Sequence, residues 1–258
     1  MQLTKKLFSK LIFLGGFGIL IFSSLVNLYD NKERFQGKLD LFKLQDKSEI
    51  KRKFTKDFDK YWVNQLKEGG YIVYMRHAER NKWLYTGMFD AAEISENRRG
   101  ENEYFEDFVC LNNKGKIQAK MIKEFIKKHG MKISQVISSP SCRARQTAEI
   151  GFGKIDIEDK VLVYESVFDE DKNIWQQKLR KFFDQLNIEE ESNIVITAHG
   201  RVIFKTLFDN NDELKNTELP SKIKEGGFYV ISKNNGELKL EHQFINFKDF
   251  SKYINTRY

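Results

Sequence analysis

The sequence lacks several features that would place it in a common functional class. It has no internal repeat, and its four histidines and two cysteines form no cluster with carboxylates at metal-ligand spacing. Its lysines are scattered and form no basic block, which argues against a nucleic-acid-binding tail. We therefore expect no metal, no other cofactor and no nucleic-acid partner. The net charge of +7 still favours an anionic partner, either a phosphate-bearing ligand or a membrane surface.

Charge is absent from one stretch near the N-terminus. The segment from Leu11 to Tyr29 has no charged side chain, and at helical rise it spans ~28 Å, close to the thickness of a bilayer's hydrocarbon core. The surroundings of Ser23 and Ser24 make a poor signal-peptidase site, so the segment favours an uncleaved transmembrane helix over a cleaved signal. Lysines precede it, and the positive-inside tendency then places the rest of the chain outside the cytoplasm.

Composition divides the chain into three parts. Residues 1–30 are the predicted membrane anchor, and residues 31–68 are a charged linker. The aromatic residues late in this linker suit an amphipathic helix packed on the edge of a domain. Residues 69–258 are long enough for one domain with a sizeable core.

Predicted strands and helices alternate along residues 69–258. We expect strands at 71–75, 133–138, 160–165, 193–198, 227–232 and 237–244, and helices at 112–128, 141–150, 173–186 and 201–208. The run Asn234-Asn235-Gly236 indicates a hairpin between the last two strands. His242 alternates with apolar residues on the final strand and is expected at the surface. The fold class predicted is α/β, a three-layer αβα sandwich with a mainly parallel central sheet and an antiparallel edge.

Basic side chains stand where the predicted strands end. Arg76 and His77 follow the first strand, His199 follows the strand at 193–198, and Arg143 begins the helix after the second strand. Because ligands bind at the carboxyl ends of the strands in such sheets, these side chains should converge on one crevice. Two arginines can hold phosphate oxygens, and a neutral imidazole pinned by a backbone acceptor is a competent nucleophile. The leaving oxygen then needs a carboxylic acid as proton donor.

Four motifs carry a family resemblance. They are "MRHAER", "LNNKGKIQA", "SSPSCRARQTA" and "ITAHG", and together they resemble, in order, those of the histidine phosphatase superfamily, in the branch that includes phosphoglycerate mutases. The resemblance covers about residues 69–244 and implies a phosphoglycerate mutase-like fold. It implies that His77 becomes phosphorylated and that Arg76, Arg143 and His199 surround the phosphoryl group.

The leaving-group acid stays open. Glu165 falls roughly where mutase-like members carry theirs, but the pattern that follows it in those members is missing. Asp169 and Glu170 are alternatives, and some members have no such acid. Glu79 is predicted to join the substrate-binding set, orienting the histidine loop or pairing with a basic residue, with a solvated charge as the alternative. A polar insertion at residues 81–109 could cover the pocket and set substrate choice, although a solvated loop is its simplest interpretation.

The two cysteines give an indication of the cellular compartment in which the domain folds. Exported members that the sequence resembles carry cysteines at the places of Cys110 and Cys142, which implies a disulfide between them. Two unpaired, packed cysteines are the alternative. A disulfide would agree with a domain outside the cytoplasm, either periplasmic or extracellular.

The sequence as a whole predicts a membrane-anchored phosphomonoester hydrolase that works through a phosphohistidine on His77. Its substrate is expected to be a small phosphorylated molecule or a phosphoprotein, and the sequence does not identify it. One alternative is a catalytically weak relative that only binds a phosphorylated ligand. Another is a mutase that moves phosphate within a sugar acid.

Overall fold

A computed structural model describes residues 59–83, 86–95, 106–164, 171–203, 205–208 and 223–253. These residues belong to a compact unit that runs from Asp59 to Tyr258. The predicted membrane span at 11–29 lies outside the described residues. Within the described ranges, no helix is both long enough and apolar enough to cross a membrane.

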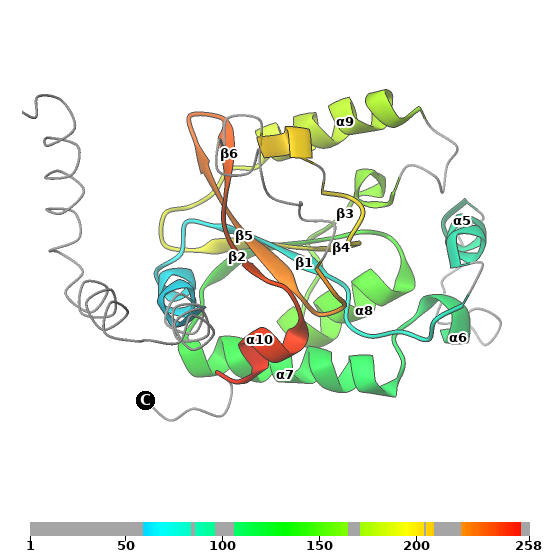
Figure 1. Cartoon of the computed structure of the whole chain (residues 1–258), viewed down its shortest axis with the longest axis horizontal. Coiled ribbons are helices and arrows are strands. Elements are labelled where there is room, and N and C mark those ends of the chain that lie inside the picture. The colour runs from blue at the N-terminus through cyan, green and yellow to red at the C-terminus, as the bar shows by residue number, and fades with distance from the viewer. Residues whose placement is uncertain are drawn as a thin grey trace, which may run out of the picture. The chain divides into compact units, whose positions relative to one another are not determined.

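A mixed six-stranded sheet forms the centre of the described fold (Figure 1). Its strands are β1 (Ile72–Arg76), β2 (Ile133–Ser138), β3 (Ile157–Glu158), β4 (Asn193–Ala198), β5 (Phe228–Asn234) and β6 (Glu237–Phe244). Their spatial order is β3-β2-β4-β1-β5-β6. The first four of these run parallel, whereas β5 and β6 are antiparallel to their neighbours. The mainly parallel sheet with an antiparallel edge is therefore confirmed.

Helices cover both faces of this sheet (Figure 1). Beyond residue 83, the described helices are α5 (Thr86–Ser95), α6 (Glu106–Val109), α7 (Asn113–His129), α8 (Cys142–Phe152), α9 (Lys172–Gln185) and α10 (Phe247–Ser251), with 3₁₀ turns η1 (Lys160–Leu162) and η3 (Lys205–Phe208). In Figure 1, α7, α8 and α10 lie below the sheet and α9 lies above it, while α5 and α6 stand at the right. The predicted α/β class is confirmed.

Burial explains why the central strands read as continuous apolar runs. All six residues of β4 are buried, and so are four of the five residues of β1. Both strands lie inside the sheet with helices on each face, so neither face meets water. The flanking helices are amphipathic instead: α9 buries Trp175, Leu179 and Phe183 along one side.

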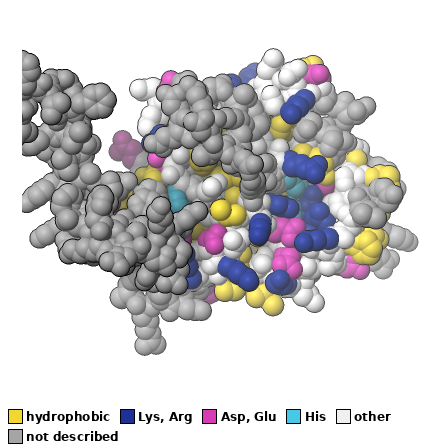
Figure 2. All heavy atoms as spheres, in the orientation of Figure 1, with side chains coloured by type: hydrophobic (Ala, Val, Ile, Leu, Met, Phe, Trp, Pro, Cys, Tyr) yellow, Lys and Arg dark blue, Asp and Glu magenta, His cyan; other side chains and the backbone are white. Residues whose placement is uncertain are grey.

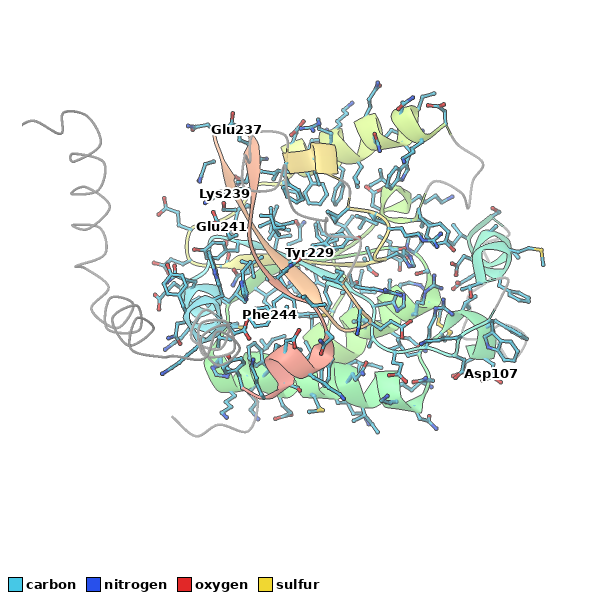
Figure 3. All side chains as sticks on the ribbon, in the orientation of Figure 1. Asp107, Tyr229, Glu237, Lys239, Glu241 and Phe244 are labelled. Carbon is cyan, nitrogen blue, oxygen red and sulfur yellow. A yellow bond between two sulfur atoms is a disulfide. The ribbon has the colours of Figure 1, made fainter. Side chains whose placement is uncertain are left out.

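The edge hairpin has the geometry that its sequence predicts. Asn235 and Gly236 have φ angles of 52° and 84°, and they connect the paired residues Asn234 and Glu237. A two-residue turn of this kind needs positive φ at both positions, which asparagine and glycine tolerate best. Along the outer strand β6, Glu237, Lys239 and Glu241 place charges at the free edge of the sheet (Figure 3). Such charges discourage pairing with another chain.

Two predicted elements differ from the structure. The described part of the strand predicted at 160–165, residues 160–164, is not a strand: the short strand β3 precedes it, and the 3₁₀ turn η1 begins after Asp159. The Asp159 side chain accepts a hydrogen bond from Val161 N, and the Trp175 side chain bonds the carbonyl of Val163, so this apolar run packs under α9. In the predicted helix at 201–208, the described residues form a turn followed by η3.

The helix at the end of the predicted linker packs on the domain. Residues 59–68 are helical and bury Trp62, Val63 and Leu66. The ring of His242 stacks on Trp62, and His242 Nε2 lies 2.8 Å from an oxygen of Asp59. The prediction that His242 is at the surface was wrong, because this helix covers its side of β6.

A disulfide joins Cys110 to Cys142, with the two Cα atoms 4.8 Å apart. Both cysteines are buried. The bond connects the end of α6 to the first residue of α8, and Phe89 and Phe108 pack against it. The predicted disulfide is confirmed.

We expect the double substitution Cys110→Ala and Cys142→Ala to lower the free energy of unfolding by ~3 kcal/mol, because the bond closes a loop with a sequence separation of 32 residues. Urea denaturation of the oxidised protein and the variant would measure this difference. Reductant should destabilise the unmodified protein and leave the double variant unchanged. Equal midpoints for the oxidised and reduced protein would contradict the prediction.

Candidate active site

The sheet brings the two histidines of the motifs together. β1 and β4 are parallel neighbours in which Arg76 pairs with Ala198, and the backbone N–H of His77 donates to the carbonyl of Ala198. His77 and His199 therefore leave adjacent strands at the same edge of the sheet. Their ring centroids lie 5.4 Å apart, and both side chains are buried. The structure thus supports the convergence expected from the strand ends.

The backbone fixes the tautomer of His77. Its Nδ1 lies 2.8 Å from the carbonyl oxygen of Ala78, and because a carbonyl only accepts, Nδ1 carries the hydrogen. The lone pair is left on Nε2. Burial lowers the pKa of His77 well below its usual value, and the positive charge of Arg143 lowers it further. The side chain is therefore a neutral imidazole at neutral pH, with its lone pair on Nε2.

His199 takes the opposite tautomer. Arg143 Nη2 donates to His199 Nδ1 over 3.2 Å, so the hydrogen of His199 sits on Nε2. This Nε2–H lies 3.1 Å from the hydroxyl of Ser139 and 3.2 Å from that of Ser141. Burial and the nearby arginines lower the pKa of His199 well below its usual value. Both histidines are thus neutral while their surroundings are cationic.

The Nε–H of Arg76 is one of the donors that this side chain keeps available. Its Nη1 donates to the carbonyl of Ile223 over 2.9 Å, and Nη2 lies 3.6 Å from a carboxylate oxygen of Glu225. Its buried Nε has no hydrogen-bond partner among the described residues. Gly200 makes room for the side chain, since a Cβ there would stand 3.1 Å from Arg76 Cδ.

Arg143 is held by a carboxylate from the insertion. Its Nη1 and Nη2 donate to the two oxygens of Asp90 over 2.5 and 2.6 Å, and the side chains of both residues are almost completely buried. Burial by itself would lower the pKa of Arg143, but the charge of Asp90 more than offsets this and raises it. Tyr164 donates its hydroxyl to Asp90 over 2.7 Å. Burial and the charge of Asp90 raise the pKa of Tyr164, which therefore stays a hydroxyl donor.

Two of the motifs act mainly on the backbone of the histidine loop. Thr147 of α8 accepts a hydrogen bond from Ala78 N, and Gln118 of α7 accepts one from Glu79 N, each over 2.9 Å. Helix α7 approaches this loop so closely that a Cβ at Gly115 would lie 1.9 Å from the carbonyl oxygen of Glu79. The glycine, glutamine and threonine of these motifs therefore fix the loop that carries His77.

The remaining predicted site residues have mixed outcomes. The carboxylate of Glu79 forms an ion pair with Lys114, at 2.8 Å, so the structure pairs it with a basic residue as one of its predicted roles required. A part in substrate binding stays a prediction. The candidate acids Glu165, Asp169 and Glu170 lie outside the described residues.

The insertion, predicted either to cover the pocket or to be a solvated loop, contributes two carboxylates that were not predicted as site residues. Its described parts are not a solvated loop, because α5 buries Asp90 and Glu93. Glu93 accepts hydrogen bonds from the backbone N–H of Cys142 and from Arg145. The sequence holds one local hint of these contacts. Asp90 and Glu93 lie one helical turn apart in α5, and α8 carries two arginines, Arg143 and Arg145, that offer one partner to each.

Basic groups gather on this face of the molecule. The space-filling view shows lysine and arginine side chains close to acidic ones and to a partly visible histidine (Figure 2). Arg80 also lies close to the site, because its charge lowers the pKa of His199, and its buried Nε has no hydrogen-bond partner in the described structure. Within the same ranges, no group of His, Cys, Asp and Glu could hold a metal ion.

Comparisons with known proteins agree with the motifs. Residues 72–163 match the family model of the histidine phosphatase superfamily (branch 1), so the predicted resemblance is confirmed. This match supports an enzyme of the phosphatase or mutase type. No curated protein matches the sequence.

Solved structures of similar proteins share little sequence with this chain. A phosphoglycerate mutase from Bacillus anthracis str. Sterne has 14% identity and a TM-score of 0.46, covering 73% of this chain and 98% of its own. The protein histidine phosphatase SixA complexed with tungstate has 14% identity and a TM-score of 0.42, covering 67% and 96%. A phosphoserine phosphatase from Entamoeba histolytica has 15% identity and a TM-score of 0.40, covering 67% and 95%. Similarities of this size do not identify a substrate.

The buried histidines predict a pH dependence of stability. Their pKa values are lowered on folding, so below about pH 6.5 the unfolded chain binds protons that the folded protein excludes. Stability should therefore fall as the pH drops from 7 to 5, by up to ~1.4 kcal/mol per pH unit for each histidine. Denaturation at the two pH values would measure this. In His77→Asn, whose amide can still donate to the Ala78 carbonyl but cannot titrate, the decrease should be smaller, and an identical decrease would contradict the prediction.

Proposed function

We propose that this protein is a phosphomonoester hydrolase that forms a phosphohistidine on His77. The observation that carries the proposal is the state of His77: its Nδ1 hydrogen is engaged by a backbone carbonyl, and its pKa is lowered well below the usual value by burial and by Arg143. A neutral imidazole nitrogen beside buried guanidinium groups is suited to attack a phosphorus atom whose oxygens those cations hold.

The proposed reaction has two steps. In the first, Nε2 of His77 forms a bond to phosphorus while the bond from phosphorus to the ester oxygen breaks, and the departing oxygen takes up a proton. In the second, water attacks phosphorus, the nitrogen–phosphorus bond breaks, and inorganic phosphate and a proton are released. Arg76 and Arg143 would balance the charge on the phosphoryl oxygens in both steps. Glu165 is the proposed donor to the departing oxygen, with Asp169 or Glu170 as alternatives.

The substrate proposed is a small phosphorylated molecule or a phosphoprotein. A second candidate function is binding of a phosphorylated ligand with little turnover. One observation favours it: both Nη groups of Arg143 already donate hydrogen bonds to Asp90. Turnover of a generic aryl phosphate would separate the two functions. Dependence of activity on a bisphosphorylated primer would instead point to a mutase.

Replacing His77 by Ala should lower kcat/KM for an aryl phosphate by several orders of magnitude, the scale lost when a nucleophile is deleted. Arg143→Lys should also be severely damaging, because a single ammonium cannot replace the planar fork that contacts both Asp90 and His199. A colorimetric assay on the full chain would measure both effects. His129→Ala, at the far end of α7, serves as the matched histidine control, and near-normal turnover in His77→Ala would reject the mechanism.

We further propose that residues 11–29 anchor the protein in a membrane and that the domain faces the periplasm or the exterior. The disulfide between Cys110 and Cys142 supports this location, because such bonds persist in oxidising compartments.

Cell fractionation should recover the protein with membranes and with an intact N-terminus, because a charge-free segment of this length suits a bilayer. The N-terminal sequence of the recovered protein would be the measurement. A soluble form that begins between about residues 24 and 32 would show a cleaved signal instead. A reporter fused after Tyr258 and active only in the cytoplasm would contradict the orientation.

A further inference from the structure

The guanidinium of Arg143 has almost no donor left for a ligand. Arginine carries five N–H donors. In Arg143, two go to the oxygens of Asp90, one goes to Nδ1 of His199 and one makes a longer contact of 3.4 Å with the carbonyl of Val109. Only the buried Nε–H has no partner among the described residues. A phosphoryl group can therefore engage Arg143 through both ends of its fork only if it takes the place of Asp90.

Helix α5 holds Asp90 in this position. Tyr164 donates its hydroxyl to the same carboxylate over 2.7 Å. One turn further along α5, Glu93 accepts hydrogen bonds from the backbone N–H of Cys142, at 3.0 Å, and from Arg145, also at 3.0 Å. The carboxylate is thus presented to Arg143 by a helix that is itself bonded to the start of α8.

We propose that Asp90 competes with the phosphoryl group for Arg143, so that the site binds a phosphorylated ligand only when that ligand displaces the carboxylate. This inference rests on the proposed function of the site. Asp90 and a phosphate both offer a pair of oxygens to a planar fork, the arrangement that arginine binds most strongly. The incoming ligand must therefore outcompete a carboxylate that already makes this paired contact.

Charge decides which ligands can do so. A phosphomonoester is mostly a dianion at neutral pH, with three terminal oxygens, whereas a phosphodiester is a monoanion with two. The dianion can engage Arg143 and still offers charge to Arg76 and Arg80, which are close enough to His199 for their charges to lower its pKa. A monoanion replaces the charge of Asp90 with an equal charge, so its gain in electrostatic binding free energy is small. The displacement cost is the same for both ligands, so a diester is left with little net binding.

Binding to the full chain tests this proposal without relying on turnover. Isothermal titration calorimetry at pH 7.5 would compare inorganic phosphate, as the dianion, with dimethyl phosphate, as the monoanion. Asp90→Asn keeps the shape of the side chain and removes its charge, and Tyr164→Phe removes one hydrogen bond that holds Asp90. Glu106→Gln makes the same type of carboxylate-to-amide change on α6, where Glu106 pairs with Lys116, and is the matched control.

We expect Asp90→Asn to bind phosphate about tenfold more tightly than the unmodified protein, the change that corresponds to ~1.4 kcal/mol. Dimethyl phosphate binding should tighten by a similar factor, because removing the competitor relieves both ligands of the same displacement cost. Tyr164→Phe should shift both quantities in the same direction by a smaller amount, and Glu106→Gln should change neither.

Weaker phosphate binding in Asp90→Asn and in Tyr164→Phe would overturn the proposal, because it would mean that Asp90 only positions Arg143. If Asp90→Asn does not fold, Tyr164→Phe decides whether Asp90 competes with phosphate or only positions Arg143. Absence of phosphate binding in all variants would also overturn it. Hydrolysis of an aryl phosphate by the unmodified protein is measured separately. Phosphate binding that responds to Asp90→Asn without hydrolysis would reject the proposed function alone, and hydrolysis without that response would reject the competition alone.

Discussion

The buried positive charge of Arg143 is the constraint on which the rest of the site depends. A buried charge whose partner is removed costs roughly 3–5 kcal/mol, so the fold has to supply a counter-charge at this place. Asp90 supplies it from α5, and Glu93 of the same helix does so for Arg145 two residues further on. The insertion between β1 and α7 therefore folds onto the start of α8. The disulfide at Cys142 holds the same region from the other side, through α6.

The same low-dielectric, cationic surroundings determine the state of the two histidines. Burial and the neighbouring arginines both disfavour a protonated ring, so His77 and His199 stay neutral. The carbonyl of Ala78 then sets the tautomer of His77. Arg143, together with two serine hydroxyls, sets the tautomer of His199. A neutral imidazole with one free nitrogen is the form in which histidine can act as a nucleophile. The charge balance around Arg143 thus connects folding to the proposed chemistry.

Much of this arrangement could be predicted from local patterns. The apolar runs at 133–138 and 193–198 are strands with the predicted bounds, because a strand buried on both faces needs side chains without charge. The hairpin at Asn235 and Gly236 followed from the backbone freedom of those residues. Helix ends shifted by one or two residues. The apolar run at 160–165 was misread because apolar residues alone do not say whether a segment pairs in a sheet or packs under a helix.

The sequence by itself determined the class of fold and the convergence of Arg76, His77 and His199, because the strand ends follow from periodicity and from the family motifs. Tertiary structure alone decided what surrounds them. Asp90 and Arg143 are separated by 53 residues, and the spacing of carboxylates and arginines in the sequence does not establish that the two will pair. The burial of His242 likewise depends on a helix far away in the chain. Pairings of this kind arise only when distant segments pack and exclude water, which makes an unpaired charge or polar ring costly.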